Sequence, residues 1–194
     1  MPSPDLQRLR ENLRSQTLAA LRLTPEYANL EAGNPSPAGT WPDIDYADRS
    51  PSVWGPRKHL VNTQSLIARD DRESRHHALT AIRWWLDHDP LSLNWWHNQI
   101  GAPRLLAHSL LLLGEHVPAR MLDDSRRILE RTGDFILDAD AGTRTATTWT
   151  GANRLWISAN RLFAGALFAD EALVADSLSA AVREIRIAPH DEEG

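Results

Sequence analysis

The sequence GANRLWISANRLFAGALFADEALVADSLSAAVREIRI, residues 151 to 187, predicts a pair of antiparallel helices. Its first part, Gly151 to Phe168, places apolar residues at the spacings of a long helix. The second part, Asp170 to Ile187, continues the helical pattern after a single residue, so we expect it to run back along the first. This stretch therefore predicts a helical hairpin as a unit of the fold.

The rest of the chain predicts further helices joined by loops, without a convincing strand. Apolar spacing, together with Pro and Gly at the ends, predicts helices over residues 5–23, 56–69, 73–86, 103–113 and 118–131. A turn is expected over 94–101, and long loops over 24–55 and 138–150. Helical hairpins in series with long loops indicate an all-α fold, a partial α/α toroid or bundle of antiparallel helical hairpins.

Composition limits the classes of function. The 194 residues suit one domain, with a helix and a long Pro/Gly-rich loop in 1–55 and the toroid helices in 56–194. A net charge of −5 argues against nucleic acid or an anionic membrane as a partner. The chain has no Cys, and Lys58 is its single lysine among 21 basic residues. No signal-peptide pattern is visible at the amino terminus.

Two clusters combine indole rings with amide or guanidinium groups: Asn94–Trp96 and Trp149–Arg154. Indole faces stack on pyranose rings and amides hydrogen-bond their substituents, so each cluster suits a sugar-binding cleft. Both lie at helix starts or in the loops before them. In an α/α toroid such loops line one open face, and we therefore expect the clusters to share a cleft.

Asn153 has two interpretations. Thr150 as N-cap, followed by small residues, would make the segment an ordinary helix start. An amide at a helix start in a cleft can instead hydrogen-bond a carboxylate and stabilise charge that develops when a proton leaves the adjacent carbon. Both interpretations are kept at this point.

The histidines show no metal-binding or catalytic spacing. His59 and His108 lie on apolar helix faces, which favours hydrogen-bonded core positions, whereas His97 adjoins the Trp pair and is a candidate for ligand contact. Trp84 and Trp85 are expected in the core. The acidic residues of loop 43–48 lack the pattern of a calcium loop. We therefore expect no metal and no cofactor.

The segments NWWHNQIGAPR (94–104) and TGANR (150–154) resemble signatures of polysaccharide lyase family 8, which includes hyaluronate, chondroitin AC and xanthan lyases. The resemblance extends from about Trp41 to Gly194. It implies an amino-terminal α/α toroid followed by a β-sandwich domain. It also implies β-elimination on uronate-containing glycans, and hence an acidic polysaccharide as partner in an extracellular location.

Site residues follow from the same resemblance. Asn153 matches the asparagine that engages the uronate carboxylate and makes the α-proton more acidic. Trp95 and Trp96 match the aromatic patch that positions sugar rings. Asn94 and Arg104 occupy matching cleft positions, and Trp149 is a candidate by adjacency. The full set of expected site residues is Asn153 as catalytic residue, with Asn94, Trp95, Trp96, Arg104 and Trp149 as substrate-binding residues.

The resemblance also implies what the chain lacks. The family's catalytic His and Tyr follow the motif asparagine at a distance that falls beyond Gly194, and His190 has no matching surroundings. We therefore expect a lyase fragment without the later toroid helices and the β-sandwich domain, inactive alone and prone to self-association through unpartnered helix faces. The alternatives are a non-catalytic glycan-binding module and a nonfunctional product of a split gene.

Overall fold

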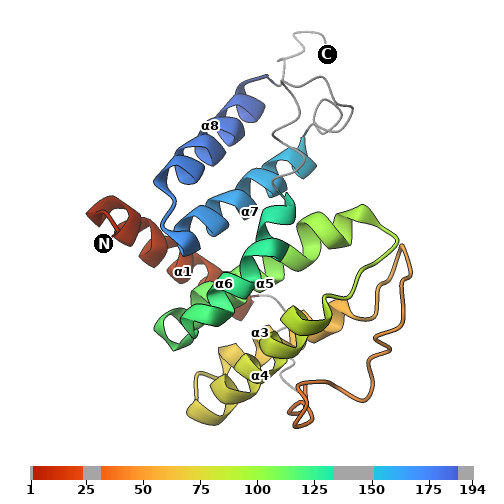
Figure 1. The fold of residues 1–194 in the computed structure, drawn as a ribbon. Coiled ribbons are helices and arrows are strands. Elements are labelled where there is room, and N and C mark those ends of the chain that lie inside the picture. Colours follow the sequence, from red (N-terminus) through yellow and green to blue (C-terminus); the bar gives the residue numbers. More distant parts are fainter. Residues whose placement is uncertain (1, 24–31, 133–150, 188–194) are drawn as a thin grey trace.

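The computed structural model describes residues 2–23, 32–132 and 151–187, and every regular element in these ranges is helical. Figure 1 labels the main helices along the chain. They are α1 (Pro4–Leu23), α3 (Arg57–Ala68), α4 (Arg72–His88), a π-helix (His97–Gly101), α5 (Ala102–Leu113), α6 (Ala119–Leu129), α7 (Ala152–Phe168) and α8 (Glu171–Ile187), with short 3-10 turns at Gly114–His116 and Glu130–Thr132. The prediction of an all-α fold is confirmed.

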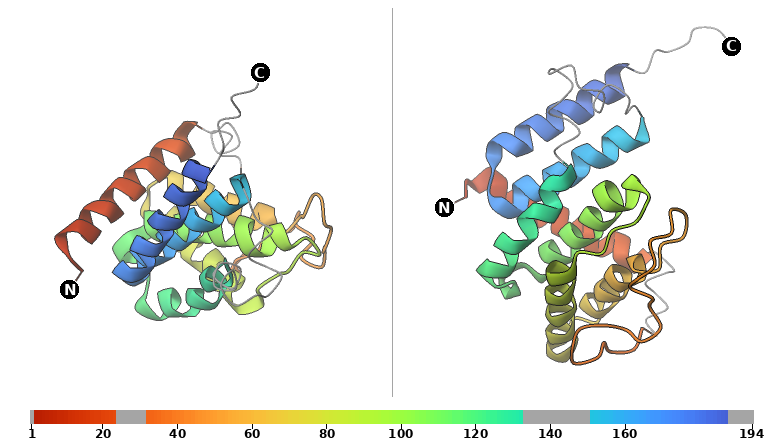
Figure 2. Two further views of the ribbon diagram at one scale, coloured as in Figure 1. Left: turned by 90° about the horizontal axis from the view of Figure 1, so that it is seen from above. Right: turned by 45° about the vertical axis from the view of Figure 1, so that its right-hand side comes forward.

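Helix α5 is the centre of the fold. Ten of its twelve residues are buried, and it contacts α1, α3, α6, α7 and the π-helix. The hairpin α3/α4 lies on one side of α5 and the hairpin α7/α8 on the other, as the two further views show (Figures 1 and 2). Within the described residues, no helix has the length and apolarity needed to cross a membrane.

Ordinary end signals explain where the helices begin and end. Asp71 caps α4, because its Oδ1 accepts a hydrogen bond from Ser74 N at 2.8 Å. Asp89 ends the same helix in the left-handed conformation, with φ of 44°. Gly114 follows α5 with φ of 56°, a conformation that suits glycine. Because these signals are local, the predicted helix ends lie within two residues of the observed ones.

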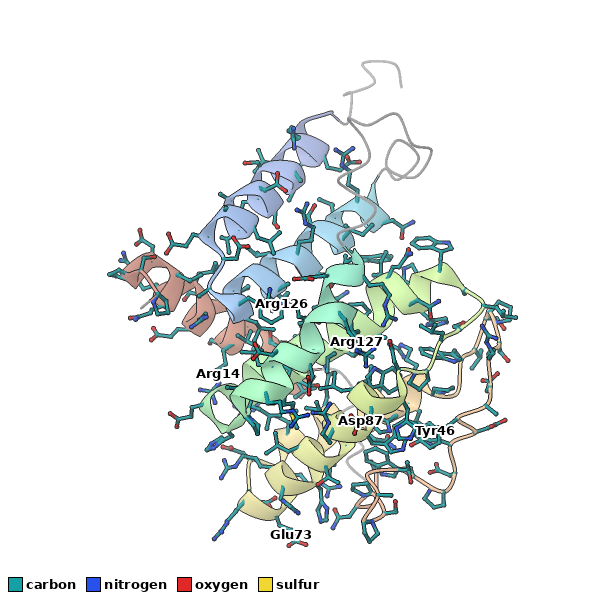
Figure 3. All side chains as sticks on the ribbon, in the orientation of Figure 1. Arg14, Tyr46, Glu73, Asp87, Arg126 and Arg127 are labelled. Carbon is teal, nitrogen blue, oxygen red and sulfur yellow. The ribbon has the colours of Figure 1, made fainter. Side chains whose placement is uncertain are left out.

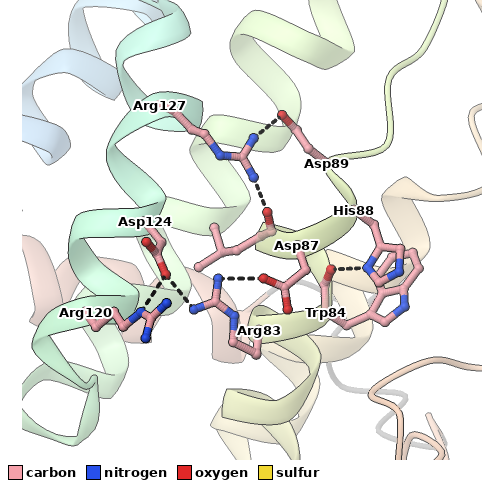
Figure 4. Close-up of polar contacts among 9 residues, drawn as sticks. Arg83, Trp84, Asp87, His88, Asp89, Arg120, Asp124 and Arg127 are labelled. Carbon is pink, nitrogen blue, oxygen red and sulfur yellow. Dashed lines mark hydrogen bonds and ion pairs between the residues drawn. The ribbon is translucent and has the colours of Figure 1, made fainter.

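Ion pairs hold α4 against α6. Asp89 Oδ2 accepts from Arg127 NH1 at 2.6 Å. Arg83 lies between two carboxylates, with NH1 at 2.7 Å from Asp124 Oδ2 and NH2 at 3.0 Å from Asp87 Oδ1 (Figure 4). These side chains are partly exposed, so each pair contributes modestly and the network mainly fixes the relative position of the two helices.

A buried histidine attaches the loop before α3 to the helices. His59 is fully buried; its Nδ1 lies 3.0 Å from Tyr46 Oη and its Nε2 lies 3.0 Å from Ala81 O. The carbonyl only accepts, so Nε2 carries the proton and Nδ1 accepts from the Tyr46 hydroxyl. That hydroxyl in turn accepts from Trp41 N at 3.1 Å. Tyr46 therefore points from the loop toward α3 and α4 (Figure 3).

The neutral state of His59 makes the fold sensitive to acid. Burial lowers the pKa of His59 from 6.5 to about 4, while the unfolded chain keeps the ordinary value. The unfolded state therefore takes up the proton first as the pH falls. The free energy of unfolding should decrease between pH 6.5 and pH 4, by up to about 3 kcal/mol from this group, and the loss should stop below the folded pKa. Urea unfolding across this range measures the effect.

His108→Gln is the control, because His108 has a similarly lowered pKa and would otherwise contribute to the same slope. NMR detection of the His59 ring gives an independent check. A ring that titrates near pH 6.5 in the folded protein would contradict the buried neutral state.

Candidate functional site

A row of backbone carbonyls holds the Trp-rich segment. Four consecutive carbonyls of residues 49–52, the carbonyl row, each accept a hydrogen bond from the segment 92–97. The bonds are Leu93 N to Arg49 O at 2.9 Å, Ser92 Oγ to Ser50 O at 2.8 Å, Asn94 Nδ2 to Pro51 O at 2.8 Å and His97 Nε2 to Ser52 O at 3.3 Å. The loop before α3 thus fixes the backbone that carries Trp95 and Trp96.

The side-chain amide of Asn94 hydrogen-bonds this backbone directly. Its Oδ1 accepts from Trp96 N at 3.0 Å, and its Nδ2 donates to Pro51 O. The amide keeps one further lone pair and one further N–H, so contact with a ligand is compatible with the positioning role. His97 is also a support: it is buried, its ring lies 5.4 Å from that of Trp54, and burial lowers its pKa.

Trp96 is seated on a glycine. A Cβ at Gly101 would lie 2.8 Å from Trp96 Cζ3, so the indole occupies the space where another residue would have a side chain. The residues between them, His97–Gly101, form a π-helix where the sequence predicted a turn. Its wider turn is a form often found at functional sites. The glycine therefore sets where the Trp96 ring lies.

Gly101→Ala should displace the Trp96 ring. We expect a net loss of about 1 kcal/mol in the free energy of unfolding, since overpacking is partly offset by the helix preference of Ala. The near-ultraviolet circular dichroism should change because the indole environment changes. Gly33→Ala is the matched control, because nothing lies within 4 Å of a Cβ there. Identical spectra for the two variants would contradict the seating of Trp96 on Gly101.

The two predicted clusters are joined through Trp156, which sequence reasoning missed. The Trp96 and Trp156 rings meet edge to face, with centroids 5.8 Å apart and planes at 81°. Trp156 is 37% exposed and lies one helical turn after Asn153 on α7. Asn160, one turn further on, donates from Nδ2 to Ile100 O at 3.0 Å. Asn153, Trp156 and Asn160 follow helical spacing, and this pattern in the sequence could have predicted that they share one face of the helix.

Asn153 lies in the first turn of α7, half-buried, and its side chain makes no hydrogen bond to any residue in the described ranges. The N-cap position is Gly151, with φ of 64°, so the interpretation of Thr150 as N-cap is wrong. The Gly151 N–H donates to Glu184 Oε1 at 2.5 Å. Asn153 therefore takes no part in capping, and its half-buried amide lies at the positive end of the helix dipole.

A pocket of about 210 Å³ lies between α1, α3 and α5, and we call it the Trp96 pocket. Trp96 and Arg104 line it together with Arg57 and Gln64 of α3 and His108 of α5. Neither Arg57 nor Arg104 forms an ion pair with a carboxylate in the part of the chain that the structure describes. The pocket therefore combines an aromatic wall with two uncompensated guanidinium groups.

His108 does not add to this charge at neutral pH. Burial, and to a lesser degree the charge of Arg104, lowers its pKa to about 4. The ring packs on Phe163 with centroids 4.6 Å apart. The positive character of the Trp96 pocket therefore comes from arginines, which stay charged at all relevant pH values.

The structure brings several predicted site residues together. Trp96 and Arg104 share the pocket, Asn94 fixes the backbone of Trp96, and the helix of Asn153 joins Trp96 through Trp156. Trp95 is half-buried beside them, and Trp149 lies outside the described residues. Arg57 was missed, because only the packing of α3 on α5 places it opposite Arg104. In the described ranges no group of three or more His, Asp or Glu could hold a metal ion.

Comparison with known proteins identifies the family to which this chain belongs. The profile of the polysaccharide lyase family 8, N terminal alpha-helical domain, matches residues 58–194. The chain belongs to polysaccharide lyase family 8. Chondroitinase-AC of Pedobacter heparinus is 28% identical over 174 residues, which are 85% of this chain and 23% of that protein.

Two solved structures of lyases share the fold. A chondroitinase AC lyase, known from enzyme–oligosaccharide complexes, aligns with a TM-score of 0.69 and 22% identity over 90% of this chain and 27% of that one. The Paenibacillus xanthan lyase aligns with a TM-score of 0.66 and 17% identity over 92% of this chain and 19% of that one. The predicted partial α/α toroid of family 8 lyases is thereby confirmed. The chain spans about a quarter of the length of the chondroitinase relatives.

Proposed function

We propose that the chain binds uronate-containing glycan of the hyaluronan, chondroitin or xanthan type and holds the substrate-binding part of a β-elimination site. The observation that carries this proposal is the convergence of Trp96, Arg57 and Arg104 in one pocket. An aromatic face suits the sugar ring, and guanidinium groups pair with carboxylates in a bidentate manner. The name of the chondroitinase relative fits an acidic polysaccharide as the ligand.

Asn153 is the proposed catalytic residue. A uronate α-proton is weakly acidic, and its removal places charge on the adjacent carboxylate. An amide without a hydrogen-bond partner among the described residues, at the positive end of α7, stabilises that charge as it develops. Trp156 extends the stacking surface from Trp96 along α7, because its partly exposed ring meets that of Trp96 and its position is one helical turn after Asn153.

The described residues hold a His–Tyr pair that does not serve this reaction. Tyr46 and His59 are hydrogen-bonded, but His59 is fully buried and both of its ring nitrogens are engaged. We therefore expect these 194 residues alone to bind glycan without cleaving it.

A non-catalytic glycan-binding module is the second candidate, and the same pocket favours it. In either case the ligands are extracellular polymers, so we expect the protein to act outside the cell.

Titration with hyaluronan, chondroitin and xanthan oligosaccharides tests binding, with Trp fluorescence or calorimetry as the readout. Arg104→Gln should weaken binding about tenfold or more, because a charged hydrogen bond contributes about 1.5–3 kcal/mol. Arg72→Gln, an exposed arginine on α4 outside the pocket, is the matched control. Equal affinity in the two variants would overturn the role of the pocket.

The same mixtures should show no rise in ultraviolet absorbance from unsaturated uronides. Release of such products by the purified chain would show that the proton-transfer groups lie within it, and would overturn the expected lack of cleavage. Binding without product supports the substrate-holding role.

We further propose self-association through α8. Leu178, Val182 and Ile185 lie on one face of this helix, and they are 47%, 44% and 66% exposed. Val182→Glu should shift the chain toward monomer in light scattering coupled to size exclusion, since it places a charge in the centre of this face. Val53→Glu, at an isolated exposed position, is the control. A monomeric parent chain at all concentrations would contradict the proposal.

A further inference from the structure

A second pocket, the Lys58 pocket, lies on another side of α3. Its volume is about 580 Å³, and it is lined by loop residues 32–34 and 41–43 and by the face of α3 that carries Lys58, Val61, Asn62 and Ser65. These four positions follow the helical spacing i, i+3, i+4 and i+7. No lining residue is shared with the Trp96 pocket. The proposed glycan cleft therefore leaves this pocket unexplained.

Asn62 is a buried polar residue that lines the Lys58 pocket. Its residue is 6% exposed, and its side chain makes no hydrogen bond to any part of the chain that the structure describes. The amide atoms of Asn62 are not among the fully enclosed side-chain atoms that lack a partner, so they are open to the pocket. An amide that donates and accepts, placed in a pocket without a protein partner, is therefore available to a ligand.

The rim of the pocket presents a donor and an acceptor side by side. Lys58 Nζ lies 2.5 Å from Asp43 Oδ2, and both side chains are more than half exposed. The hydrogen bond from Lys58 lowers the pKa of Asp43, so this carboxyl group is ionised at neutral pH. The charges offset one another, which disfavours a free anion. Neighbouring hydroxyl groups, each able to donate and accept, match such a pair.

The walls of the pocket are apolar and fixed. Trp41 is 4% exposed, its Nε1 donates to Gly33 O at 2.7 Å, and its ring meets that of His59 at 88° with centroids 5.0 Å apart. Pro42 and Val61 add aliphatic surface. The volume falls within the range of small-molecule sites, and polar groups on an apolar wall are typical of them.

We propose that the Lys58 pocket binds one uncharged pyranose ring, as a second sugar site separate from the Trp96 pocket. Asn62 hydrogen-bonds hydroxyls inside the pocket, while Lys58 and Asp43 hold a hydroxyl pair at the rim. A polymeric glycan that reaches both pockets would gain avidity from the second contact. The proposal does not depend on uronate recognition at Arg104.

The single lysine allows a direct test. Biosynthetic labelling with lysine that carries ¹³C at Cε places one signal at Lys58 and keeps the positive charge and all three N–H donors of its side chain. The probe is methyl β-D-glucopyranoside, with sodium acetate as the anion control. We expect a saturable NMR shift of the Lys58 Cε signal with a millimolar Kd, since a single ring offers few contact atoms.

Asn62→Leu removes the amide at similar volume and should weaken binding about tenfold or more. Asp43→Asn, at the exposed rim, should also weaken it and does not disturb the interior, so it keeps the test valid if the Leu variant does not fold. The ¹⁵N signal of the Trp41 indole follows binding independently of the label. Arg104→Gln should leave the Lys58 shift unchanged, which separates this pocket from the proposed uronate site.

Three results would overturn the proposal. They are the absence of a saturable shift, the same affinity in Asp43→Asn as in the parent chain, and an equal response to sodium acetate. If Arg104→Gln abolishes oligosaccharide binding while the glucoside gives no response, the cleft proposal stands and the Lys58 pocket fails. If the glucoside binds while Arg104→Gln leaves oligosaccharide binding unchanged, the Lys58 pocket is supported and the cleft proposal fails.

Discussion

The neutral, doubly hydrogen-bonded His59 is the contact on which the site depends. It connects Tyr46 of the loop to Ala81 of α4 across a fully buried ring. The loop held in this way continues into residues 49–52, whose carbonyls accept from the segment that carries Trp95 and Trp96. A core histidine that lines neither the Trp96 pocket nor the Lys58 pocket thereby helps to determine where the aromatic residues of the cleft lie.

The charge that lines the Trp96 pocket differs in sign from the net charge of the chain. The chain has a net charge of −5, yet Arg57 and Arg104 line one pocket without a carboxylate partner in the described ranges. Most other arginines near the helix surfaces do have partners, as Arg83 has with Asp87 and Asp124. At short range the two uncompensated guanidinium groups matter more for an acidic sugar than the overall charge, which salt screens.

The helices were predictable because their signals are local. Apolar spacing and residues such as Gly114 set their ends without reference to the rest of the fold. The π-helix at His97–Gly101 was not predictable, since it depends on the packing of Trp96 against Gly101.

The candidate site was predictable in part. Resemblance selected Trp96 and Arg104, which share a pocket, but Arg57 comes from another helix and Trp156 lies outside both predicted clusters. Gly151 rather than Thr150 at the cap position depends on Glu184 of the neighbouring helix, which a sequence motif does not show. Contacts between elements, rather than within them, account for each of these differences.

The carbonyl row has a consequence for how this region can vary. Its acceptors belong to the main chain, so the side chains of residues 49–52 can change without loss of the four hydrogen bonds. The number of residues in this segment, by contrast, is fixed by the hydrogen bonds. One inserted or deleted position would shift each acceptor to the next donor, and Trp96 would lose its place. The carbonyl row is therefore constrained more in its length than in the side chains that it carries.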